Sequence, residues 1–178
     1  MPSEIAVPRP NVKGWRELQR TLAALRRSAV NIFNNLTGDP QSYDVEWTAS
    51  VTDPRVGTNN GTLSATYFRF FRCCVVNVYM QIGTVGAAPD WSIGSGIYSF
   101  SLPIAPLTDF TWVGTGFAID ASLGTHHILA PSINLSTSLV QIHRDASASY
   151  VGSTSPMTWA ASDELAFQIT YPVAAEPA

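Results

Sequence analysis

Charged residues are scarce in this chain of 178 residues: Asp, Glu, Lys and Arg together make up 13% of it. An average soluble domain contains about 25%. The formal net charge at pH 7 is -3, so no excess of positive charge points to a nucleic acid or an anionic membrane as a partner. A sparsely charged surface is typical of a protein that packs against copies of itself or works outside a cytoplasm.

Cysteines and long apolar runs are equally rare. Cys73 and Cys74 are adjacent, and in a strand they would point to opposite faces, where a disulfide between them would strain the backbone. We therefore expect two buried free thiols and no disulfide framework. There is no apolar run of about 18 residues that could span a membrane, and no secretory signal pattern. These absences predict a protein made in a cytoplasm.

Motifs of catalysis and cofactor binding are missing as well. The sequence contains no HxH, HExxH or CxxC zinc motif and no GxSxG nucleophile elbow. His143 lies in an HRD tripeptide without the other kinase motifs, and the adjacent His126 and His127 would point to opposite faces of a strand. The candidates for a glycosidase pair are Asp90, Asp109, Asp120, Asp145, Asp163 and Glu164. Most of them lie in loops, where Asp is favoured for backbone hydrogen bonding. We therefore expect no catalytic residue, no metal and no cofactor.

An apolar stripe distinguishes residues 15–37 from the rest of the chain. Its members are Trp15, Leu18, Leu22, Leu25, Ala29, Ile32 and Leu36. Their spacing alternates between three and four residues, as in the heptad seam of a coiled coil, and Gly38 and Pro40 are typical of a helix end. The residue types differ from the Ile and Leu pattern of dimers, which favours more than two strands. We expect a short coil of three helices; a helix packed on its own β-domain is the alternative.

Residues 1–14 contain three prolines and no periodicity, so they cannot be helical and have no core of their own. An extended arm ahead of an oligomerising helix would suit attachment to a larger particle. The side chains expected to make that attachment are Ile5, Val7, Arg9 and Val12. Simple terminal disorder is the alternative.

From Tyr43 onward the apolar period changes to two. After a linker at 38–44, residues 45–178 read as short strands separated by clusters of Gly, Pro, Asn, Asp and Ser. The clearest segments are YDVEWTASV, GIYSFSLPI, TWVGTGFAID, THHILAPSI, SLVQIHR and ELAFQITYPV. Seven or eight such strands predict a mainly β domain, an antiparallel β-sandwich or jelly roll.

Residues 45–106 carry a more specific pattern. A Gly-Thr-Leu entry leads into a Tyr/Arg-rich strand, then a hydrophobic strand, a glycine-rich turn and a Gly-x-Tyr-x-Phe-x-Leu-Pro strand. The residues are Gly61, Thr62, Leu63, Tyr67, Arg69, Gly83, Gly94, Gly96, Tyr98, Phe100, Leu102 and Pro103. This pattern resembles the C-terminal β-domain of small fibre, tail and minor virion proteins of phages that infect actinobacteria.

The resemblance covers about a third of the chain and departs from the family at FFRCCVV, where the family more often has a Gly-Lys or similar turn. The sequence therefore leaves open whether residues 61–83 form two strands or one long bent strand. The family motifs encode strands and turns rather than chemistry. The resemblance implies a structural protein of the virion that is usually a trimer, which agrees with the heptad stripe.

Two aromatic residues in loops are candidates for binding a sugar ring. Trp91 lies in a Gly/Pro-rich loop and Tyr150 in a Ser-rich loop, whereas Trp112 and Trp159 begin apparent strands and are expected in the core. We expect a homotrimeric fibre or decoration protein on a capsid or tail, with other virion proteins and a host surface glycan as partners. A small carbohydrate-active enzyme and a free-standing lectin-like module are the alternatives.

Overall fold

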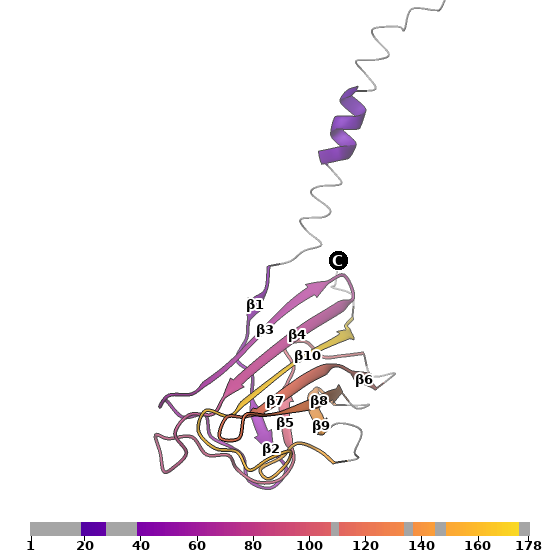
Figure 1. Cartoon of the computed structure of the whole chain (residues 1–178). Helices are drawn as coiled ribbons and strands as arrows, with labels where there is room; N and C mark the ends of the chain where they lie inside the picture. The colour runs from indigo at the N-terminus through magenta and orange to yellow at the C-terminus, as the bar shows by residue number, and fades with distance from the viewer. Residues whose placement is uncertain (1–18, 28–38, 108–110, 134–136, 145–148, 175–178) are drawn as a thin grey trace, which may run out of the picture. The chain divides into compact units, whose positions relative to one another are not determined.

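Figure 1 shows a computed structural model of the chain, which describes residues 19–27, 39–107, 111–133, 137–144 and 149–174. The chain divides into two compact units, Met1–Gly38 and Asp39–Ala178. In the first unit, residues 19–27 form an α-helix, as predicted. Leu22 and Leu25 of this helix are 55% and 60% exposed. The other members of the predicted stripe, and all four predicted attachment residues, lie outside the described residues.

The described residues of the second unit form ten antiparallel strands, which confirms the predicted mainly β class. The strands are β1 (Gln41–Ser42), β2 (Trp47–Ala49), β3 (Thr62–Phe70), β4 (Cys73–Gln81), β5 (Tyr98–Ser101), β6 (Trp112–Val113), β7 (Thr115–Asp120), β8 (Thr125–Ile133), β9 (Leu139–Arg144) and β10 (Glu164–Pro172). Short strands joined by turns of Gly, Pro, Asn and Asp are the expected product of a period-two sequence.

The strands form one continuous curled sheet, a half-barrel, in the order β1-β3-β4-β10-β7-β8-β9-β5-β2, with β6 beside β8. In the part of the chain that the structure describes, the strand pairing does not divide into the two separate sheets of a sandwich. β10 pairs with β4 on one side and with β7 on the other, so its two ladders link the halves of the sheet. Curling lets one face of this single sheet enclose the core.

Side chains of alternate residues supply that core. In β4 the inward residues Cys74, Val76, Val78 and Met80 are 0–2% exposed, while the residues that alternate with them are partly exposed. β10 alternates in the same way. At the other end of the sheet, the rings of Trp47 and Tyr98 meet edge to face at 5.1 Å. The predicted core positions are confirmed for Trp159, which is 3% exposed, and Trp112 packs against the core while remaining half-buried.

The segment that the sequence left open is a hairpin. β3 and β4 pair along their full nine residues, ending with Phe70 opposite Cys73. The two-residue turn is Phe71-Arg72, and Phe71 adopts a φ of 52°, a left-handed conformation usually occupied by Gly or Asn. Both cysteines are free, as predicted, and they point to opposite faces. The prediction that both are buried is wrong: Cys74 is buried and Cys73 is exposed.

The two ends of the sheet are held together by the first residues of the unit. β1 and β2 lie at opposite ends of the strand order, yet only residues 43–46 separate them. The Tyr43 N–H donates to the Ala65 carbonyl in β3, and its hydroxyl donates to the Ser101 carbonyl in β5 at 3.2 Å. Burial raises the pKa of the Tyr43 hydroxyl well above its ordinary value. Tyr43 therefore links the two edges of the curled sheet.

Candidate interaction surface

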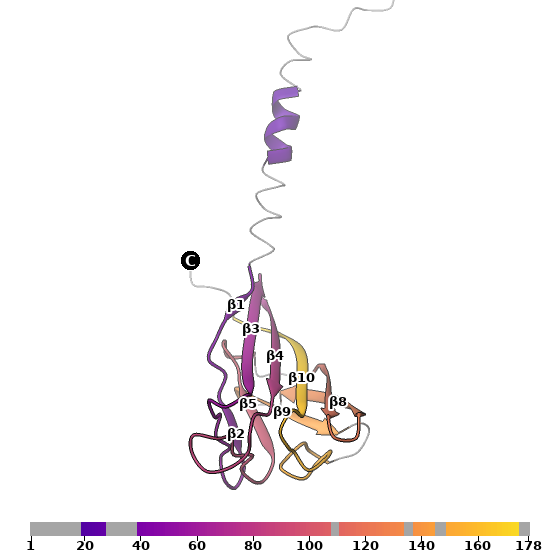
Figure 2. The same cartoon turned by 60° about the vertical axis from the view of Figure 1, so that its left-hand side comes forward.

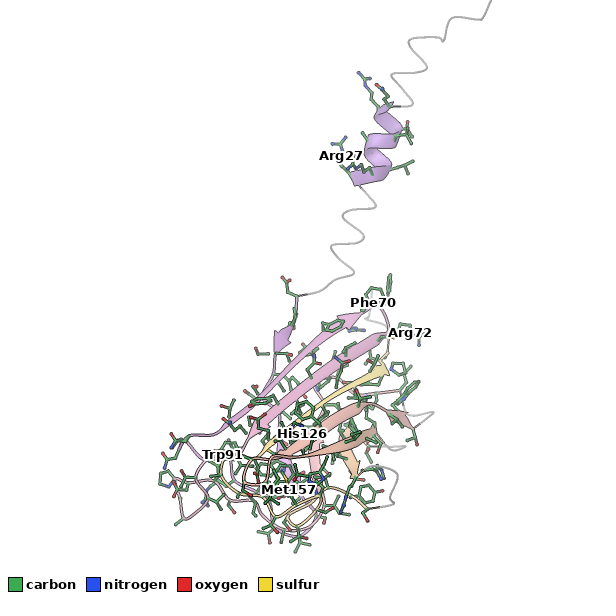
Figure 3. All side chains as sticks on the ribbon, in the orientation of Figure 1. Arg27, Phe70, Arg72, Trp91, His126 and Met157 are labelled. Atoms are coloured by element: carbon green, nitrogen blue, oxygen red, sulfur yellow. The ribbon has the colours of Figure 1, made fainter. Side chains whose placement is uncertain are left out.

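The structure places the predicted sugar-binding Trp91 in the core, so the prediction of an exposed indole at a loop tip is wrong. Trp91 has no exposed surface, and its ring lies 6.2 Å from that of Trp47. It belongs to the loop end of the unit, where Met157 also lies, at the opposite end from Phe70 and Arg72 (Figure 3).

The burial of Trp91 has a clear local cause. A side chain at Gly61 or Gly83 would collide with the indole ring, so these glycines make the space that Trp91 fills. The Arg55 guanidinium then fastens the loop by donating to the carbonyls of Gly86 and Asp90, each at 3.0 Å. A Gly/Pro-rich composition indicated a loop correctly, but it carried no signal that the loop folds back onto the core.

Tyr150, the other predicted ligand-binding residue, is half-buried. Its ring packs on that of His143 at a centroid distance of 4.3 Å, and the two residues form an isolated β-bridge. The structure does not bring Tyr150 together with Trp91, because Trp91 lies in the core under a different loop.

Two of the acidic candidates, Asp120 and Asp163, stabilise turns through hydrogen bonds. Asp120 accepts hydrogen bonds from the Ser122 hydroxyl and N–H and from the Leu123 N–H, at 2.6–3.0 Å. The Ser122 hydroxyl bond is the main reason that the pKa of Asp120 is lowered. Asp163, 1% exposed, accepts from the N–H groups of Ala121 and Ala160 at 2.9 and 2.7 Å. Asp120 and Asp163 thus fix the turn between β7 and β8.

The remaining chemical candidates are dispersed. His126 and His127 lie in β8 and point to opposite faces, as predicted, since His126 is opposite Ile119 and His127 opposite Ala118. Asp90 binds the Asn59 amide in a loop, while Asp109 and Asp145 lie outside the described residues. Among the residues that the structure describes, no three His, Cys, Asp or Glu side chains gather into a possible metal site.

The most distinctive surface is the side of the sheet that faces away from the core, over β3, β4, β10, β7 and β8. Figure 2 shows β3, β4 and β10 side by side in this part of the sheet. Strand register and alternation define this outer face. Its members are Thr62, Ser64, Thr66, Phe68, Val75, Asn77, Tyr79, Gln81, Glu164, Ala166, Gln168, Thr170, Thr115, Phe117, Ile119, His126, Ile128 and Ala130. Glu164 alone among them is an Asp, Glu, Lys or Arg.

Large apolar side chains are exposed on this outer face. Ile128 is 78% exposed and Phe117, directly opposite it on β7, is 41% exposed. In most sheets with one exposed face, each strand alternates apolar residues toward the core with polar or charged residues toward solvent. Here the outward positions include Val, Phe, Ile, Tyr and Ala. Extended exposed apolar surfaces are typical of sites where proteins contact one another.

The outer face also contains a hollow of about 520 Å³. Tyr79 and Phe117 stand on either side of Ala166, whose small side chain forms the floor, and Ser64 continues the same row on β3. The hollow therefore results from small residues on neighbouring strands between two large rings.

Several polar side chains of the outer face bind one another. Gln168 donates to the Asn77 side chain at 2.7 Å, across β10 and β4. Burial, and then the Glu164 carboxylate to which it is hydrogen-bonded, raise the pKa of Tyr79. Because these groups already have partners, covering them costs less free energy than covering bare polar atoms.

Comparisons with family models, with curated proteins and with solved structures found no match. In the described part of the chain, no helix combines the length and the apolar character needed to cross a bilayer.

Sequence reasoning had not singled out the outer face. The signal was present in VVNVYM of β4, where the positions between the core residues are Val75, Asn77 and Tyr79 rather than charged residues. Such a strand carries no charge on either side and is mostly apolar, which is typical of a strand that is covered on both faces.

Proposed function

We propose that this chain is a homotrimeric structural protein of a phage particle, a fibre or decoration protein on the capsid or tail. Its β unit would be a jelly-roll-like head, and residues 15–37 would form a three-stranded coil. The observation that carries the proposal is the outer face of the sheet, because an apolar face that remains exposed in one chain is suited to burial against others.

Identical chains are the partners that such a face fits best. Surfaces of two copies carry the same charges, so a charged face would repel its own copy unless the charges were arranged to alternate. The outer face avoids this problem because Glu164 is its only residue of fixed charge. Apolar side chains such as Phe117 and Ile128 gain free energy on leaving water whatever the orientation of the partner.

The helix adds a second, independent reason for self-association. Leu22 and Leu25 occupy neighbouring positions of the heptad stripe, and both are more than half exposed. A helix of this length is marginal alone in water. Contacts between the β units would therefore support the coil, and the coil would raise the local concentration of the β units.

The virion assignment rests on the resemblance over residues 45–106. Its motif residues fall in β3 and β5, directly before β3, directly after β5, and in the segment between β4 and β5. A trimeric head repeated many times on a particle would turn weak contacts with a host glycan into firm attachment through avidity. Tyr150 remains the candidate residue for such a contact. The lectin and enzyme alternatives lose support because Trp91 is buried and Asp120 and Asp163 are engaged in turns.

The mass of the full-length protein in solution tests the proposal. Light scattering on a sizing column should give three times the chain mass of 19.2 kDa. A monomer at micromolar concentration would contradict the proposal and leave the outer face to a different partner. A dimer would contradict the three-stranded coil.

A further inference from the structure

We propose that the tip of the β3–β4 hairpin enters the headgroup region of a lipid bilayer that carries anionic phospholipids. The hairpin tip consists of the consecutive residues Arg69, Phe70, Phe71 and Arg72, at the end of the β unit opposite the loop end (Figure 3). The inference goes beyond the proposed function and does not depend on it, because a single chain already carries the tip.

Two phenyl rings are exposed side by side at the hairpin tip. Phe71 is 68% exposed and Phe70 is 39% exposed, and their rings meet edge to face at a centroid distance of 4.9 Å. Both lie at the end of two paired nine-residue strands, on a projection rather than in a hollow. Small ligands such as sugars bind mostly in concave sites. A projecting apolar tip can instead enter the fluid interface of a bilayer, which needs no preformed pocket.

Phe71 occupies a backbone position that suits its side chain poorly. Its φ of 52° belongs to the left-handed region, which Gly, Asn and Asp adopt far more readily than a bulky residue. A phenylalanine therefore strains this turn, where Asn or Gly would relax it. Such strain is typical of positions where a side chain serves function rather than folding, so it supports a role for the exposed ring outside the fold.

The turn is held in place by the end of β10. The Arg69 guanidinium donates to the carbonyls of Phe71 and Ala174, at 3.3 and 2.6 Å. The Val173 N–H donates to the Arg72 carbonyl at 2.8 Å. These bonds fix the backbone that carries the two rings, and a preorganised tip loses little conformational entropy when it binds.

Positive charge is concentrated at the same place. Residues 39–178 contain four arginines and no lysine, and two of the four, Arg69 and Arg72, flank the phenylalanines. The hairpin from Thr62 to Gln81 contains no Asp or Glu. Basic side chains attract anionic lipid headgroups, and stable attachment needs this attraction together with buried apolar groups. The net charge of the whole chain concealed this pattern, because its acidic residues lie outside the hairpin.

A dye on a native cysteine tests the contact directly. Cys73 is exposed and lies opposite Phe70, whereas Cys74 is buried, so a polarity-sensitive thiol dye should label Cys73. Vesicles of phosphatidylcholine and phosphatidylglycerol in equal parts, added to the labelled full-length protein, should shift the dye emission to shorter wavelength. An unchanged emission would overturn the inference.

The matched control carries the dye on Leu123→Cys in a Cys73→Ser background. Leu123 is 77% exposed, and it lies in the turn after β7. That end of β7 pairs with Glu164, at the far end of β10 from the hairpin tip. The control emission should stay unchanged on addition of vesicles. An equal shift at both positions would show that the vesicles bind without preference for the tip, and would also overturn the inference.

Co-sedimentation with the same vesicles measures the partition coefficient of the unlabelled protein. Phe71→Asn should lower the partition coefficient about tenfold, because one exposed ring is lost, and Leu123→Asn should leave it unchanged. Arg72→Gln should lower it about fivefold at low salt and have little effect at high salt, where the charge is screened. Phe71→Asn should not lower the temperature of thermal unfolding, since Asn tolerates the left-handed turn.

The same measurements separate the possible partners of the tip. Equal partitioning of the wild type and Phe71→Asn would overturn the inference, and a marked fall in the unfolding temperature of Phe71→Asn would assign the ring to the fold instead. Loss of particle incorporation by Phe71→Asn, without vesicle binding by the wild type, would assign the tip to a protein partner. A trimer that does not bind vesicles would overturn the inference alone, whereas a monomer that binds them would overturn only the proposed function.

Discussion

At the scale of single residues, two carboxylates of the β unit each accept several hydrogen bonds from neighbouring turns. Asp163 is 1% exposed and accepts two backbone N–H groups, from Ala121 and Ala160, which belong to different turns. Asp120 accepts hydrogen bonds from the N–H groups of Ser122 and Leu123, which belong to the same turn as Ala121. The two acids together join the loop before β10 to the turn that precedes β8.

Asp163→Ala should lower the free energy of unfolding by about 2–4 kcal/mol, because two backbone N–H groups would lose their acceptor in a buried place. Chemical denaturation followed by tryptophan fluorescence measures the change. Asp44→Ala, an exposed carboxylate in the segment between β1 and β2, is the control and should change the stability by less than about 0.5 kcal/mol. Equal effects of the two substitutions would contradict the structural role given to Asp163.

The sequence could indicate loops at these residues but not their interior contacts. Asp and Gly in loops predict turns through local bonding, and Asp120 follows that rule within three residues. Asp163 binds Ala121 across 42 positions of the chain, and the space for Trp91 is made by Gly61 and Gly83 from other segments. Such contacts depend on how distant strands pair, which period-two patterns do not specify.

At the scale of elements, the helix has exposed leucines that would be stabilised by contact with another helix. Residues 19–27 show Leu22 and Leu25 exposed on a short helix. Leucines at heptad spacing stabilise helices when they pack against the leucines of other helices in a coiled coil. Helical propensity alone would not hold so short an element in water.

Replacing both leucines, Leu22→Asp/Leu25→Asp, should dissociate the trimer or weaken it markedly, since carboxylates cannot be buried in a coil seam without partners. Far-ultraviolet circular dichroism should retain its β signal, because the sheet belongs to the other unit. Light scattering measures the mass. Gln19→Asp, which changes the same helix outside the stripe, is the control. A double variant that keeps the mass of the wild type would show that the stripe does not hold the copies together.

Most strands could be located from the sequence, since THHILAPSI contains β8 and ELAFQITYPV contains β10. The β3–β4 hairpin could not, because Phe71-Arg72 lacks the Gly or Asn that marks a two-residue turn. β1 was also missed, because two residues are too few to show a period. The curled single sheet escaped prediction because strand order depends on long-range pairing.

At the scale of the whole molecule, the proposed assembly gives each segment of the chain a different role. Residues 1–14 would attach to a particle, the helix would gather three chains and the β unit would present the head. The outer face, with its one fixed charge at Glu164, would then lie between copies, and the loop end that contains Trp91 and Met157 would be free of that contact.

Deleting residues 1–14 should abolish incorporation into particles while leaving the trimer mass of the purified protein unchanged. The arm contributes three prolines and no part of the heptad stripe, so its loss removes attachment without touching the coil. Co-sedimentation of the deletion variant with particles, against the full-length chain, is the measurement. Undiminished incorporation would rule out the arm, and Ile5, Val7, Arg9 and Val12 with it, as the attachment site.

The link that Tyr43 makes between the two sheet edges determines how the β unit would respond to mechanical load. A pull transmitted along the chain enters the unit at Asp39 and reaches the two-residue pairing of β1 with β3 first. Beyond it, the load meets the Tyr43 bonds to Ala65 and Ser101, while the nine-residue ladder of β3 and β4 lies further along the chain. Under tension the β1–β3 pairing and the Tyr43 hydrogen bonds would break before the longer β3–β4 ladder. The β unit would therefore lengthen by a short step and then resist further extension.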